Sequence, residues 1–80
     1  MKIQILLFAH LREAAGFEMK TLEVTAGSTV GAIARNVFST TLKKFSGSPV
    51  RFAVNEDFVS EETRLREGDG LAFIPPVAGG

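Results

Sequence analysis

The sequence predicts a single α+β domain in which one main helix covers one face of a mixed five-stranded sheet. Three observations support this fold class. The chain has 80 residues, which is enough for one small domain. Five short apolar stretches bounded by turn residues read as strands. One longer stretch between the second and third of them has the 3.6-residue apolar period of a helix.

The first two predicted strands run from Lys2 to Ala9 and from Glu18 to Val24. Alternation in the first places three residues on each face: Ile3, Ile5 and Leu7 on one, and Gln4, Leu6 and Phe8 on the other. Both faces are largely apolar, so we expect this strand in the middle of the sheet. In the second strand, Leu22 and Val24 should point inward and Met19 outward. A short helical or turn segment, Leu11 to Gly16, should connect the two.

The main helix is predicted from Val30 to about Phe45, with Ser28 or Thr29 as its N-cap. Its apolar stripe consists of Val30, Ile33, Ala34, Val37, Phe38 and Thr41. The third strand should be Val50 to Val54, and a turn should lead into a short fourth strand around Phe58–Val59. A coil anchored by Leu65 and a tight turn at 67–70 then precede a fifth strand, Leu71 to Ile74.

The predicted order of two strands, one helix and three strands fits the β-grasp, or ubiquitin-like, arrangement, with the fifth strand parallel to the first. The single helix can cover only one sheet face, the face of Ile3, Ile5, Leu7, Leu71 and Phe73. The other face should carry Leu6, Phe8, Ala72, Ile74 and Phe58. We expect Leu6, Phe8, Phe58 and Ile74 on this uncovered face to form a docking site for a partner protein.

Composition excludes several classes of function. Nine basic and nine acidic residues give a net charge of zero, which argues against a nucleic-acid or anionic-membrane binder. The chain has no cysteine and one histidine, so we expect no metal site and no bound cofactor. No apolar run is long enough to span a bilayer and the N-terminus does not resemble a secretion signal, so we expect a cytoplasmic protein.

No set of side chains predicts an active site within the chain. The carboxylates Glu61–Glu62 and Glu67/Asp69 fall in hydrophilic turns and are expected to be solvated. Lys43–Lys44 should be a solvated helix end, and His10 should be a surface or packing residue because it has no evident partner. The turn at 68–70 lacks the lysine and the spacing of a phosphate-binding loop.

The C-terminal segment is the most informative part of the chain. We predict a domain over residues 1–74 and an extended arm over residues 75–80. The arm consists of Pro75, Pro76, Val77, Ala78, Gly79 and Gly80. The prolines end the strand ladder and favour an extended chain that reaches roughly 15–20 Å. Two glycines without side chains let the last carboxylate enter a narrow tunnel.

Four segments of the sequence together resemble the small, sulfur-carrying subunit of molybdopterin synthase, a ubiquitin-like family. They are ILLFAHLREAAG (5–16), AVNEDFV (53–59), LREGD (65–69) and FIPPVAGG (73–80). The resemblance covers essentially the whole chain. Two departures are Gly70, where the family more often has an acidic residue, and a main helix with fewer leucines.

The resemblance implies that an ATP-consuming activating enzyme adenylates the Gly80 carboxylate, which is then converted to a thiocarboxylate. It also implies that Pro75 to Gly79 enter the large synthase subunit, where the sulfur is given to a pterin precursor. The implied assembly is a heterotetramer of two small and two large chains. The catalytic side chains would belong to the partners, and the chain alone would not be an enzyme.

Other functions remain open from the sequence. The same activated carboxylate would serve a sulfur carrier for thiamine or another thio-metabolite. It would also serve a ubiquitin-like modifier that joins Gly80 to a lysine of a target protein. A fourth possibility is an interaction module with an inert tail, for which removal of Gly79 and Gly80 would change nothing.

Overall fold

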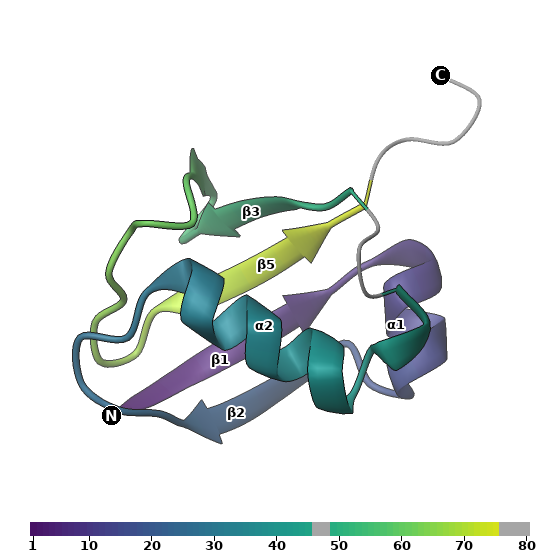
Figure 1. Ribbon diagram of the computed structural model, residues 1–80, viewed down its shortest axis with the longest axis horizontal. Helices are drawn as coiled ribbons and strands as arrows, with labels where there is room; N and C mark the ends of the chain where they lie inside the picture. Colours follow the sequence, from purple (N-terminus) through teal and green to yellow (C-terminus); the bar gives the residue numbers. More distant parts are fainter. Residues whose placement is uncertain (46–48, 76–80) are drawn as a thin grey trace.

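A mixed sheet of five strands, with one face covered by a helix, organises the chain (Figure 1). The computed structural model describes residues 1–45 and 49–75. The strands are β1 (Lys2–Leu7), β2 (Met19–Glu23), β3 (Arg51–Val54), β4 (Asp57–Val59) and β5 (Gly70–Ile74). The helices are α1 (Ala9–Ala15), α2 (Val30–Thr40) and a 3₁₀ turn, η1 (Lys43–Phe45).

The strand order is β2-β1-β5-β3-β4, with β5 parallel to β1 and the other neighbours antiparallel. This topology confirms the predicted β-grasp arrangement. One detail of the prediction was wrong, because the central strand is β5 and β1 lies one place from it. The reason is that β1 and β2 occupy one side of β5, while the β3–β4 hairpin pairs with its other edge.

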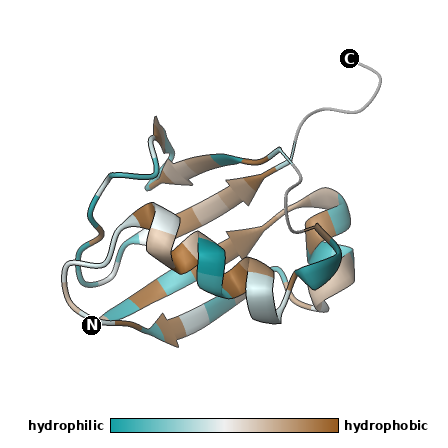
Figure 2. Ribbon diagram, viewed as in Figure 1, coloured by the Kyte–Doolittle hydropathy of each residue, from teal (hydrophilic) through white to brown (hydrophobic). Residues whose placement is uncertain are grey.

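The hydrophobic core lies between α2 and the sheet. The five sheet residues predicted for this face are each at most 1% exposed: Ile3, Ile5, Leu7, Leu71 and Phe73. Helix α2 adds Val30, Ile33, Ala34 and Val37 from one side. Figure 2 shows hydrophobic colour on β1 and β5 behind α2 and a strongly hydrophilic stretch in the middle of α2. Burial of this helix face against the sheet is the main stabilising term of the fold.

The Phe73 ring is the centre of this core. It lies 5.6 Å from the ring of Phe38 on α2 and 5.3 Å, edge to face, from the ring of Phe52 on β3. Both separations fall in the range that favours aromatic pairs. Phe73 therefore joins the helix to two neighbouring strands.

Helix α2 begins where the sequence predicts and ends earlier. The Thr29 hydroxyl oxygen accepts a hydrogen bond from the Ala32 N–H (3.2 Å), so Thr29 rather than Ser28 is the N-cap. The helix ends at Thr40 instead of near Phe45. Near this end the hydroxyls of Ser39 and Thr40 both donate to the Asn36 carbonyl, which is the competition that disfavours such residues inside helices.

The early end of α2 changes one predicted core position. The amides of Thr41 and Leu42 both donate to the Val37 carbonyl, which turns the chain out of the helix. Thr41, predicted on the apolar stripe, is exposed, and Leu42 is 1% exposed in the core. Leu42 was missed because the helical period was extended past the point where the backbone leaves it.

The segment after β1 is a true helix, α1, that starts two residues before the predicted position. Its Leu11 is fully buried, and Gly16 ends it with φ 84°, where its N–H donates to the Arg12 carbonyl. Glycine adopts this left-handed conformation without a Cβ clash. No helix in the described part of the chain has the length and apolar character needed to cross a membrane.

Side chains join the turn between β3 and β4 to the turn that precedes β5. The amide group of Asn55 accepts a hydrogen bond from the Gly70 N–H and donates one to the Asp69 carboxylate, both at 3.0 Å. The same carboxylate accepts from the Arg66 N–H at 2.8 Å. Asp69 is thus a structural residue that holds the predicted tight turn and ties it to the β3–β4 hairpin.

Candidate functional site

The face of the sheet opposite α2 has no layer over it in the described part of the chain. Strand register brings one residue of each strand into a single row across this open face: Met19, Leu6, Ala72, Ala53 and Phe58. All five are apolar. The next row on this face, toward the first residues of β1 and β5, contains the polar Thr21 and Gln4 beside Gly70, which has no side chain.

On the other side of this row the face remains apolar. Leu6 pairs with Ala72, so Phe8 continues β1 beside Ile74, the last residue of β5. We call Met19, Leu6, Ala72, Ala53, Phe58, Phe8 and Ile74 the apolar patch. It contains the three large hydrophobic residues that are exposed in the described chain, with exposures of 47% for Phe8, 54% for Met19 and 56% for Phe58.

The apolar patch encloses a shallow hollow of about 390 Å³. Small residues, Ala53, Ala72 and Gly70, form part of its lining, and the larger Leu6, Phe8, Phe58 and Ile74 also line it. A Cβ atom on Gly70 would lie 3.5 Å from Leu6 Cδ1, so a side chain there would fill part of the space. The lining also includes the polar residues Gln4, Asn55 and Glu56.

The structure brings together Leu6, Phe8, Phe58 and Ile74, as the parity of the strands predicted. Pro75 directly follows β5 and is buried. Pro76, Val77, Ala78, Gly79 and Gly80 lie outside the described residues, so the predictions for the arm stay predictions. What the described chain does fix is that the arm starts at the edge of the apolar patch, next to Ile74.

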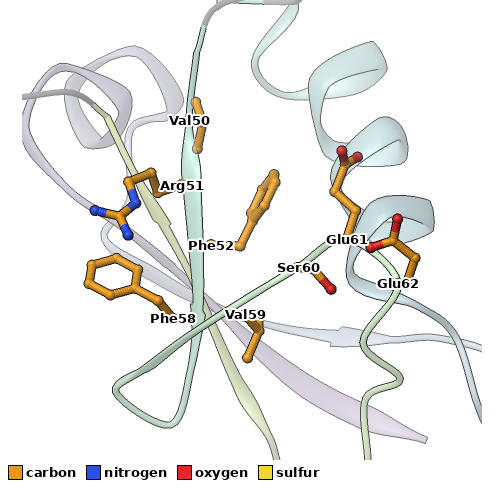
Figure 3. Close-up of a pocket in the computed structure, with 8 residues that line it drawn as sticks. All are labelled: Val50, Arg51, Phe52, Phe58, Val59, Ser60, Glu61 and Glu62. Atoms are coloured by element: carbon orange, nitrogen blue, oxygen red, sulfur yellow. The ribbon is translucent and has the colours of Figure 1, made fainter.

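Two residues of this face were missed by sequence reasoning. Met19 was predicted to point outward, but only the β1–β2 register shows that it lies beside Leu6. Arg51 stacks its guanidinium carbon 3.9 Å from the centre of the Phe58 ring (Figure 3). The Phe58 ring belongs to another strand, so no local pattern could have indicated this contact.

The polar side chains considered as catalytic candidates lie on the surface in the described chain. Glu61, Glu62 and Glu67 are exposed, as predicted, and His10 is an exposed residue whose ring packs 5.2 Å from Phe45. No group of three or more histidine or acidic side chains within residues 1–45 and 49–75 could hold a metal ion. The arrangement is suited to binding a protein surface.

Comparison with known proteins finds the same fold in solved structures and identifies the family to which the sequence belongs. The sequence model of the ThiS family matches residues 5–80. The chain is 33% identical to a molybdopterin synthase sulfur carrier subunit from Arabidopsis thaliana, over 100% of this chain and 84% of the relative. The Escherichia coli protein of the same name is 34% identical over 98% of this chain and 99% of its own.

Solved structures agree with the sequence comparison. A putative subunit 1 of molybdopterin converting factor from Pyrococcus furiosus has a TM-score of 0.86 and 26% identity, covering 96% of this chain and 99% of that one. SAMP1 from Haloferax volcanii, a small archaeal modifier protein, has a TM-score of 0.86 and 25% identity over the whole of both chains.

Proposed function

Because the chain belongs to the ThiS family and aligns over its full length with sulfur carrier subunits of molybdopterin synthase, we propose that it is such a carrier. The observation that supports this best is that the family match runs to residue 80 and so includes the Gly79–Gly80 end. The apolar patch at the base of the arm supports it from the structure. A carrier of this kind needs a docking surface and a reactive terminus rather than catalytic side chains.

The chemistry proposed for Gly80 follows from the reactivity of a carboxylate. A carboxylate is a poor electrophile until one oxygen becomes part of a good leaving group. An activating enzyme that consumes ATP would form the acyl adenylate with release of pyrophosphate, and hydrosulfide would then attack the carbonyl carbon and displace AMP to leave a thiocarboxylate. Since the chain has no cysteine, the terminus is the group on which it could carry sulfur.

Two partners follow from this chemistry, the adenylating enzyme and the large subunit of molybdopterin synthase. In the large subunit the thiocarboxylate would give its sulfur to a pterin precursor. We propose that the apolar patch seats on the large subunit while residues 75–79 pass into its active site. Because ATP and the adenylating enzyme must be present, we expect the process in the cytoplasm.

The intact mass of the protein, purified from a host with a working activation pathway, tests the proposal. We expect a mass raised by one oxygen-to-sulfur exchange, located in the C-terminal peptide. The matched control is the chain without Gly79 and Gly80, which should keep its fold and stay unmodified. An unmodified full-length chain, prepared where a known carrier is sulfurated, would contradict the proposal.

The likeness to SAMP1 favours a second candidate function, that of a ubiquitin-like modifier. Here the activated Gly80 carbonyl would form an isopeptide bond with a lysine of a target protein. Recovery of the tagged chain from cells under denaturing conditions distinguishes the two functions. A modifier gives a ladder of larger covalent species that disappears when Gly79 and Gly80 are removed, and a dedicated sulfur carrier gives none.

A further inference from the structure

One charged side chain lies at the corner of the apolar patch where the arm begins. Arg51 on β3 pairs with Ile74 on β5, and Pro75 follows Ile74 directly. The central carbon of the Arg51 guanidinium lies 3.9 Å from the centre of the Phe58 ring. Arg51 and Phe58 lie on the same side of β3 in Figure 3, and Glu61 and Glu62 lie on the other side.

Stacking restrains the Arg51 side chain without using its hydrogen-bonding groups. A guanidinium that packs by its face still presents its N–H donors at the edge, in the planar fork that matches a carboxylate. The described chain has one ion pair, Arg12–Glu18 at 3.8 Å, and no described acidic group pairs with Arg51. The N–H donors of the Arg51 guanidinium are therefore restrained in position and available to bind an acceptor on another molecule.

We propose that Arg51 binds a carboxylate on the surface of the protein that receives the arm, and so selects and orients that partner. The inference rests on the proposed function and adds a specificity contact to it. Seating a partner on the apolar patch would exclude water from its edge, and charge–charge attraction strengthens as water is excluded. Charged groups at such an edge chiefly set the association rate and the choice of partner.

The position of Arg51 distinguishes a partner carboxylate from a nucleotide phosphate. An arm that is extended, as the sequence predicts, would advance ~3.1 Å per residue and carry its reacting end roughly 15 Å beyond Pro75. Arg51 is at the base of the arm, beside Ile74. An anion that contacts Arg51 is therefore one carried by the partner's docking surface, and not one bound where Gly80 reacts.

The test measures binding of the full chain to the purified large subunit of molybdopterin synthase from the same organism. Arg51→Glu is compared with Arg35→Glu, which makes the same charge change at an exposed position of α2 on the covered side of the sheet. We expect Arg51→Glu to lower the association rate constant roughly tenfold or more at low ionic strength and to weaken its salt dependence. Arg35→Glu should stay within about twofold of wild type.

A second variant separates a planar carboxylate contact from a simple charge effect. Arg51→Lys keeps the charge but loses the fork and the stacking on Phe58, and we expect affinity to fall roughly threefold or more. Equal effects of Arg51→Glu and Arg35→Glu, or wild-type affinity of Arg51→Lys, would overturn the proposal. Failure of the wild-type chain itself to bind would overturn the proposed function, and this inference with it.

Discussion

The two faces of the sheet arise from the same alternation of residues along the strands, but they differ in solvent exposure. On β5, Phe73 is fully buried under α2, and the next residue, Ile74, is partly exposed on the open face. All five predicted sheet residues of the covered face are at most 1% exposed, and the open face has three large hydrophobic residues near half exposure. One face therefore stabilises the fold, and the other leaves apolar area exposed, which fits the docking role proposed for it.

The difference arises because the described chain supplies only one helix long enough to form a second layer. Helix α2 covers one face, and α1 lies beside the end of the sheet (Figure 1). An apolar patch that stays uncovered costs solubility, so such patches are typical of surfaces that meet another protein. Substitutions on the covered face, on the open face and at its rim can test this difference between the two faces separately.

Phe73→Ala tests the covered face. Removal of this ring leaves a cavity between Phe38 and Phe52, and we expect a loss of about 3–5 kcal/mol in the free energy of unfolding. Urea denaturation followed by circular dichroism measures it. A loss below about 1 kcal/mol would mean that the core does not depend on the contacts of Phe73 with Phe38 and Phe52.

Ile74→Ala and Phe8→Ala test the open face. We expect each variant to fold normally and to lose about 2 kcal/mol of binding energy for the large subunit, roughly thirtyfold in affinity. Calorimetric titration gives the affinity, and a thermal melt of each variant is the control for folding. Wild-type affinity for both variants would remove the docking role of the apolar patch.

Glu56→Gly tests a position at the rim of the open face, in the β3–β4 hairpin. Asn55 and Glu56 have φ values of 50° and 77°, as a two-residue type I′ turn requires, and a non-glycine residue is strained at the second of these. We expect Glu56→Gly to raise the free energy of unfolding by about 0.5–1 kcal/mol, and denaturant titration measures this.

Asn55→Gly is the matched control for this turn. Glycine also adopts the positive φ of this position, but the side chain that joins Gly70 to Asp69 would be lost, so stability should fall. A gain in stability for Asn55→Gly, or a loss for Glu56→Gly, would contradict the assignment of strain to Glu56. A Glu56→Gly variant that is more stable and still binds the large subunit with wild-type affinity would show that Glu56 contributes neither to folding nor to docking.

Local sequence is enough to predict which residues point to the same side of each strand, where the turns lie and what the arm consists of. Alternation along a strand, a helix cap at Ser28 or Thr29, the glycine turns and the Gly79–Gly80 end are local properties that neighbours in the chain impose. The Leu6, Phe8, Phe58 and Ile74 set was predicted for this reason. The family resemblance of the arm likewise depends on residues that follow one another.

The way in which these local elements meet depends on contacts between residues far apart in the sequence. Register across five strands, which no single segment encodes, placed Met19 in the row with Phe58 and made β5 the central strand. The Arg51–Phe58 contact and the position of Leu42 depend equally on long-range packing. Such choices follow from closing distant strands against one core, where the total burial of apolar area, rather than any local preference, sets the lowest free energy.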